Sequence, residues 1–344
     1  MLITPKKNVL DSNKPFDSSS LDCFSQLSQL IYDLSKEHFA YLPIDPPKDI
    51  LSKIPPELPS FLENTPASRE LRCAYIQHIV SKTVTYRVFQ PFLFTLGRRY
   101  DKADTFFQML SMDIRRKSVR REAFWRQQTL KAAYTTSDAK QTINVAAAVI
   151  VDEIIDHIKH FADPKHLDSL LTGVRKIVKL AAETWRHARV ERELVLATFP
   201  APDAESVSNE GWDEYGMAKP ASPIQKTDPS RHVVLRTFPR ILREAAHEDF
   251  ASGERASPCM YSQGIVLYSD SPVVMARLQE LAKKSSETLV GDVGQLSPPK
   301  TPKGSQENLT LKGMEKLVPS APAATLTVQS APTSPRAKEA GVAV

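Results

Sequence analysis

Three side chains of one expected helix have the residue types of a metal site. Glu153, His157 and His160 are spaced i, i+4 and i+7, so a carboxylate and two imidazoles share one helix face. The spacing is neither H-E-x-x-H nor the paired E-x-x-H of di-iron bundles, and only His166 and His187 are near in sequence. We therefore expect no metal and no other cofactor, and we interpret the three as side chains flanking a helix C-terminus.

Motifs for nucleophilic catalysis and phosphate binding are absent from the sequence. It has no G-x-S-x-G elbow, no Walker loop and no G-x-G-x-x-G. Glycine is scarce, with 11 residues against 26 prolines, whereas a phosphate-binding α/β enzyme needs glycine where its backbone approaches the ligand. Cys73 is expected to be a core thiol of an amphipathic helix. These features favour a non-enzymatic protein.

The helix expected over residues 115–134 is rich in basic residues. Between 115 and 131 the sequence has seven basic residues and one acidic residue, Glu122. At 100° per residue, one face combines an aromatic ring with four cations: Phe124, Lys117, Arg120, Arg121 and Lys131. A separate stripe is apolar: Val119, Ala123, Leu130 and Tyr134. Arg115 and Arg126 flank that stripe, so we expect them to form internal ion pairs.

A cationic helix face attracts an anionic partner, which could be a nucleic acid, an acidic lipid or an acidic protein segment. The alternatives are a solvated face, arginines that bridge neighbouring helices, or an extended nuclear-localisation segment. Arg115 and Arg116 also precede Ser118, a spacing that suits a basophilic kinase. A serine inside a folded helix is poorly accessible to a kinase, so we expect little phosphorylation at Ser118.

Proline-directed phosphorylation motifs occur near both ends of the chain. Thr4 and Ser297 are each followed by proline and, three residues on, by lysine, which resembles the consensus of cyclin-dependent kinases. Thr301 and Ser334 match only the minimal form. Phosphorylation would add about −1.5 to −2 charges at each site. Separately, the acidic, aromatic residues 203–215 could fold back on the basic helix as an internal mimic of an anionic ligand.

Composition indicates a protein of the cytoplasm, the nucleus or both. The net charge of +5 is too small to identify a nucleic-acid binder. The three cysteines are far apart and form no CxxC pair, which is typical of reduced thiols. The longest apolar run, residues 145–151, is far short of the roughly 20 residues that a membrane span needs.

Hydrophobic periodicity predicts a mainly α protein. We expect a disordered segment 1–18, a bundle-like helical domain 19–198, a Pro-rich acidic linker 199–230, a small α+β module 231–288 and a disordered tail 289–344. The helices are expected over residues 20–40, 67–90, 101–114, 115–134, 137–161 and from 164 towards 198, where Gly173 is a candidate interruption. Residues 101–114 are dense in large apolar side chains: Phe106, Phe107, Met109, Leu110 and Met112.

The α+β module is expected to have two strands, 232–238 and 259–268, joined by a short helix within 239–250 and followed by a helix from 272. A two-stranded sheet is marginal alone, so we expect it to pack on the helical domain.

The sequence as a whole favours a non-enzymatic regulatory or adaptor protein that binds a protein partner and is phosphorylated in its tails. The first alternative is a nucleic-acid or chromatin protein that uses the basic helix 115–131, and the second is an enzyme of unrecognised type. A deep polar pocket would favour the enzyme. A positive face with exposed aromatic rings would favour nucleic acid, and an exposed apolar groove between helices would favour a protein partner.

Overall fold

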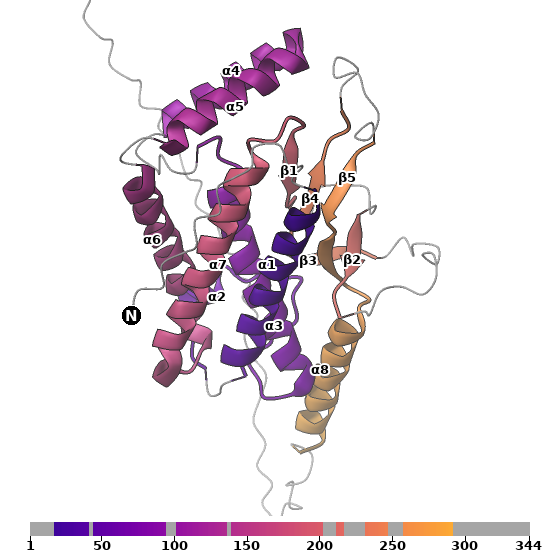
Figure 1. Cartoon of the computed structure of the whole chain (residues 1–344). Helices are drawn as coiled ribbons and strands as arrows, with labels where there is room; N and C mark the ends of the chain where they lie inside the picture. Colours follow the sequence, from indigo (N-terminus) through magenta and orange to yellow (C-terminus); the bar gives the residue numbers. More distant parts are fainter. Residues whose placement is uncertain are drawn as a thin grey trace, which may run out of the picture. The chain divides into compact units, whose positions relative to one another are not determined.

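The computed structural model describes residues 17–40, 44–93, 101–135, 139–201, 211–216, 231–246 and 257–291, all within the compact unit Met1–Val293 (Figure 1). Its helices are α1 Asp17–His38, α2 Lys48–Leu51, α3 Pro66–Val84, α4 Asp101–Lys117, α5 Val119–Thr135, α6 Ala139–Ile158, α7 Leu167–Ala188 and α8 Pro272–Gly291. Its strands are β1 Val195–Thr198, β2 Trp212–Glu214, β3 Val233–Phe238, β4 Arg240–Arg243, β5 Cys259–Ser262 and β6 Gly264–Tyr268. The predicted mainly α fold class is confirmed.

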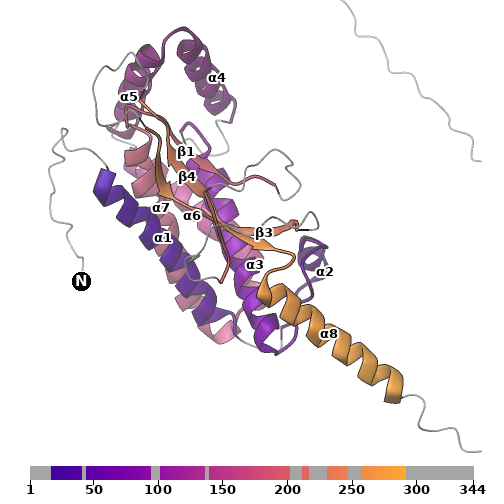
Figure 2. The same cartoon turned by 90° about the vertical axis from the view of Figure 1, so that its right-hand side faces the viewer.

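Four helices form a bundle around the main core. Helices α1, α3, α6 and α7 contact one another in cyclic order, as their neighbouring positions in Figures 1 and 2 also show. Their apolar stripes are buried, as the periodicity predicted for α1 and α7 (Phe24, Leu27, Ile31, Leu34, Val174, Ile177, Ala181 and Trp185). Gly173 does not interrupt α7. A Cβ at this position would lie 2.4 Å from Leu34 Cδ1, so the glycine permits close packing of α7 on α1.

Helix α3 is the bundle helix that contacts strand β3, and it is buried along most of its length. Its first turn is capped by Thr65, whose hydroxyl accepts from the Ser68 N–H at 3.2 Å. After Val84 the helix continues as a π-helical turn, Thr85–Phe89, before the proline at 91. The helix predicted over 67–90 is therefore present, and its final turn is wider than expected.

Polar side chains of α3 complete the hydrogen bonding of β3. The pairing of β3 with β6 shifts register between Arg236 and Phe238, which leaves carbonyl groups outside the regular ladder. His78 Nδ1 lies 2.8 Å from the Arg236 carbonyl, and Ser81 Oγ donates to the Thr237 carbonyl at 2.7 Å. Since buried carbonyl groups need partners, these bonds explain why polar residues occupy the buried face of α3.

The strands form two three-stranded sheets, ordered β1-β4-β5 and β2-β6-β3. This corrects the expected single pair of strands. The predicted strand 259–268 is divided at Gln263 into β5 and β6, which belong to different sheets. The short helix expected within 239–250 is wrong for residues 240–243, because that segment pairs with both β1 and β5 as strand β4.

The predicted extension of the last bundle helix towards residue 198 is also wrong. Helix α7 ends at Ala188, and residues 195–198 form β1. The chain between them is held by Arg126, which donates to the carbonyls of Arg189, Glu191 and Arg192 at 2.6–3.1 Å. Carbonyl groups bound in this way satisfy the end of the helix and direct the chain into the sheet.

Part of the predicted linker 199–230 is a strand. Residues 212–214 pair in parallel with β6, and a Cβ at Gly264 would lie 2.3 Å from the Trp212 ring, so glycine is required there. Tyr215 is buried and donates to Glu70 at 2.8 Å. The part of the acidic segment described here, 211–216, thus packs on β6 and α3 and not on the basic helix; residues 202–210 lie outside the described residues.

The C-terminal α+β elements pack on the bundle, as expected. Helix α8 begins at Pro272, as predicted, and contacts α3. Arg277 of α8 is fully buried, donates to the Ser60 carbonyl at 2.7 Å and pairs with Glu63 and Glu280 at 3.2 and 2.9 Å. Across the described residues, none of the helices has the length and apolar content needed to span a membrane.

Candidate partner-binding surface

Helices α4 and α5 form a hairpin with a small core of its own. They contact each other and are joined by a bend at Ser118 (Figure 2). The buried centre of this second core consists of Phe92, Leu93 and Leu130, against which Phe107, Trp125 and Tyr134 pack. Asp104 of α4 accepts from the N–H groups of Phe92 and Leu93 at 3.2 and 2.7 Å, which ties α4 to the chain that follows α3.

Two arginines of the hairpin face inward, as predicted. Arg126 is fully buried, pairs with Glu122 at 2.9 Å and holds the backbone after α7. Arg115 pairs with Glu244, which follows β4, and lies 3.8 Å from Glu122. Buried charges need partners, and the buried Arg126 has them; Arg115, which is partly buried, is also paired. The hairpin is therefore attached to the rest of the unit by these polar contacts and by the packing of its apolar side chains on Phe92 and Leu93.

The opposite face of α5 is cationic and exposed. Lys117, Arg120, Arg121 and Lys131 are all exposed, and Phe124 between them is 66% exposed. Within the described residues, none of the four cations takes part in an ion pair. Ala123 and Leu130 of the predicted apolar stripe are buried. The wheel thus divided buried from exposed residues correctly, and a binding role for the four cations stays a prediction.

Helix α4 exposes large apolar side chains that sequence reasoning did not assign to a surface. Phe106, Met109 and Met112 are 61%, 60% and 56% exposed, at spacings i, i+3 and i+6. The inner side of α4 is occupied by Phe107, Leu110 and Ile114, each partly buried. The sequence did contain a signal, because α4 has apolar residues on two faces and a surface helix buries only one. Exposed apolar residues in such a group mark interaction sites.

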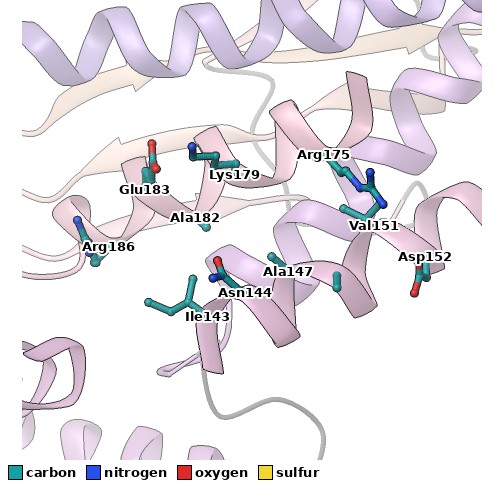
Figure 3. Close-up of a pocket in the computed structure, with 11 residues that line it drawn as sticks. Ile143, Asn144, Ala147, Val151, Asp152, Arg175, Lys179, Ala182, Glu183 and Arg186 are labelled. Carbon is teal, nitrogen blue, oxygen red and sulfur yellow. The ribbon is translucent and has the colours of Figure 1, made fainter. Parts of the chain in front are cut away.

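An apolar groove runs between α6 and α7 (Figure 3). Its volume is about 290 Å³. Its α6 side is lined mostly by small and aliphatic residues, and its α7 side by four charged residues and one alanine. The lining residues are Ile143, Asn144, Ala147, Ala148, Val151, Asp152, Arg175, Lys179, Ala182, Glu183 and Arg186. A groove of this kind between helices is the feature that, in the sequence argument, favours a protein partner.

The predicted metal candidates have other partners. Glu153 accepts two hydrogen bonds from Arg87 Nε and Nη2 at 3.0 and 3.1 Å, and His157 Nε2 lies 2.9 Å from the Tyr75 hydroxyl. Burial, followed by the positive charges of Lys53 and nearby residues, lowers the pKa of His157 to about 4. His160 is part-buried nearby. Over the described part of the chain, no group of three His, Cys, Asp or Glu side chains could hold a metal ion.

The remaining predicted residues divide into two groups. Cys73 is buried, as expected, and donates to the Ser35 carbonyl at 3.2 Å. Burial raises its pKa to about 11, so the thiol is unreactive at neutral pH. The phosphorylation candidates Thr4, Ser297, Thr301 and Ser334 lie outside the described residues.

Comparison with known proteins adds no relative: no family model, no curated protein and no solved structure matches this chain. The residues of the α4–α5 hairpin and of the α6–α7 groove are therefore the features of the molecule that point to a function.

Proposed function

We propose that this chain is a non-enzymatic regulatory or adaptor protein that binds a protein partner through the outer surface of the α4–α5 hairpin. One observation supports this most strongly. Phe106, Met109 and Met112 are exposed on α4, and α5 adds an exposed face of cations without ion pairs among the described residues. The partner that fits is an acidic segment with apolar side chains.

The apolar half of the surface would supply much of the affinity. Burying apolar area is worth about 25 cal/mol per Å², and large flexible side chains such as Met adapt to different partners. The cations of α5 would add association rate and specificity by pairing with carboxylates. The apolar groove between α6 and α7 supports the same function, since grooves between helices accept amphipathic helices.

Nucleic-acid binding is the second candidate, and one observation favours it. Phe124 is exposed among Lys117, Arg120, Arg121 and Lys131, so a base could stack on the ring while the cations contact phosphates. The exposed side chains of α4 do not fit this function, because Phe106, Met109 and Met112 have no role against a phosphate backbone.

Such a protein would act in the cytoplasm or the nucleus, where its three thiols stay reduced. We also propose that it is regulated by phosphorylation of Thr4, Ser297, Thr301 and Ser334. A cytoplasmic or nuclear partner with an acidic segment would then compete with phosphates that the chain itself acquires.

The test is affinity purification of the full-length chain from native cells, with and without nuclease. One variant replaces Phe106, Met109 and Met112 by Ser, and a second replaces Lys117, Arg120, Arg121 and Lys131 by Glu. A matched control reverses four other exposed lysines: Lys48, Lys53, Lys165 and Lys176.

We expect a partner that survives nuclease, is retained by the control and is lost from both surface variants. Recovery that needs intact nucleic acid and survives the α4 substitutions would establish the second candidate instead. A partner retained by both surface variants would contradict the use of this surface.

A further inference from the structure

We propose that Ser118, at the bend between α4 and α5, is a phosphorylation site for a basophilic protein kinase, and that its phosphate neutralises the cationic face of α5. The second half of this inference rests on the proposed function; the first half does not. It reverses the expectation from sequence, which placed Ser118 inside the helix over residues 115–134 and therefore out of reach of a kinase.

The structure interrupts the helix at Ser118. The residue is outside both α4 and α5 and is part-exposed. Its hydroxyl accepts from the Arg121 N–H at 3.3 Å, which makes Ser118 the cap of α5. This side-chain bond is long and exposed, so it opposes the exchange for contacts with a kinase only weakly. The backbone of Ser118 is paired on both sides, since its N–H donates to the Ile114 carbonyl at 2.9 Å and its carbonyl accepts from the Glu122 N–H at 3.1 Å, and these two bonds must open as well. A bend between helices also frays more readily than a helix interior.

The arginines before Ser118 have the spacing that a basophilic kinase reads. Arg116, two residues before Ser118, is exposed and pairs only across the surface with Asp113 at 2.9 Å. Arg115, three residues before, is bound to Glu244 and would exchange that carboxylate for those of the kinase. Recognition thus requires the last turn of α4 to open, while the buried Arg126 keeps α5 attached to the backbone after α7.

The reaction is transfer of the γ-phosphoryl group of ATP to Ser118 Oγ. The bond between the γ-phosphorus and the β–γ bridging oxygen breaks, the Oγ–P bond forms, and ADP leaves with the bridging oxygen. The hydroxyl proton passes to a carboxylate base of the kinase. No other reactant is needed.

The phosphate would enter a cationic neighbourhood. It adds about −1.5 to −2 charges at the N-terminus of α5, where the helix dipole and nearby cations favour it. Lys117, Arg120 and Arg121 are exposed within three residues in sequence and are available to pair with it. About half of the charge on the four-cation face is then neutralised. We expect acidic peptides to bind about fivefold more weakly, because exposed ion pairs each contribute little.

The chain has an internal control for helical context, because Ser286 is exposed but lies inside a helix. Ser286 follows Lys283 and Lys284 at the same two spacings, yet it lies inside α8, where its hydroxyl donates to the Lys283 carbonyl at 2.7 Å. If the bend gives a kinase access to the backbone at Ser118, Ser118 should be modified at least tenfold faster than Ser286. Each rate is taken relative to a synthetic peptide of the same residues, because a kinase distinguishes arginine from lysine.

The experiment treats the full-length chain with a basophilic kinase and Mg-ATP, and follows Ser118 and Ser286 by mass spectrometry. A synthetic peptide of residues 112–124 shows the rate without a fold. We expect rapid modification of Ser118, none in S118A, and slow modification of Ser286. A peptide that is modified while folded Ser118 is not, or equal rates at Ser118 and Ser286, would overturn the assignment.

The second readout is binding of a fluorescent peptide of Asp, Glu and Leu before and after kinase treatment. A loss of about fivefold at low salt that diminishes at high salt, and is absent in S118A, supports the switch. Unchanged binding by fully phosphorylated protein overturns it. If the untreated protein does not bind the peptide at all, the proposed function and the switch both fail, whereas the mass spectra still decide the site.

Discussion

Helices α3 and α5 use the same residue types for opposite purposes. In α3, Arg72 is fully buried and donates to the carbonyls of Phe39, Phe61 and Glu63, each at 3.0 Å. In α5, Arg120 and Arg121 are exposed and make no ion pair within the described residues. The arginine of α3 is part of the core, whereas the arginines of α5 are free to meet a partner.

The difference between these helices arises from their surroundings. Helix α3 is enclosed by α1, α6 and β3, and irregular backbone beside it, such as the residues around Phe61, supplies carbonyl groups that need donors. Helix α5 packs on one side only. Its single buried arginine, Arg126, has the same kind of carbonyl partners as Arg72. Arg72 and Arg126 therefore donate to backbone carbonyls inside the fold, whereas Arg120 and Arg121 face solvent.

The largest expected effect is a loss of folding stability when Arg72 is replaced. Replacing it by Met would leave three buried carbonyl groups without donors, so we expect the free energy of unfolding to fall by about 4 kcal/mol. Urea denaturation measures this change in the free energy of unfolding. The control is Arg69→Met in the same helix, at an exposed position, which should change stability by less than about 0.5 kcal/mol. Equal losses in the two variants would break the comparison.

The next largest effect is on local unfolding of the α4–α5 hairpin. Arg126→Met removes the donors to three carbonyls and the partner of Glu122, so opening of α4 and α5 should become easier by about 3 kcal/mol. Hydrogen exchange should accelerate in α5 and remain slow in α3, because the two helices belong to separate cores. Arg120→Met is the matched control. Accelerated exchange in α3 as well would show that the cores are coupled.

A smaller effect should appear as pH dependence. Burial lowers the pKa of His78 to about 4, below its ordinary value of 6.5. The unfolded chain therefore binds more protons between these values, and stability is lost as pH falls from about 6.5 to about 4. His157 acts in the same direction. We expect His78→Asn, which keeps a donor for the Arg236 carbonyl, to remove about 2 kcal/mol of the decline between pH 7 and 4.5. An unchanged decline would show that other groups cause it.

Local patterns predicted much of the helical structure. The periodicity of residues 115–134 placed Leu130 and Ala123 inside and Arg120 and Lys131 outside. This prediction is possible because a helix that buries only one face has its apolar residues on that face. The same reasoning found α1, α3, α6 and the start of α8 within a few residues. It failed for β1, β2 and β4, because strands of three or four residues are stabilised by distant partners and not by their own sequence.

The candidate surface was predicted in part. The four cations and Phe124 followed from one helix wheel, but the exposed stripe Phe106, Met109 and Met112 did not, because α4 has two apolar faces and periodicity cannot say which of them is covered. The position of Ser118 was also misjudged. Nothing in the local sequence near it excludes a continuous helix. The bend allows Phe107 of α4 and Trp125 of α5 to pack on the same ring, that of Phe92.

The sequence by itself determined the helical class, the segregation of charge on α5 and the burial of Cys73, because these depend on residues a few positions apart. Only the tertiary structure decided that Arg72 and Arg126 are buried, that residues 212–214 form a strand beside Gly264, and that α4 keeps an apolar face in solvent. Those outcomes depend on which backbone carbonyls and which helix faces meet across the fold, and residue spacing does not contain that information.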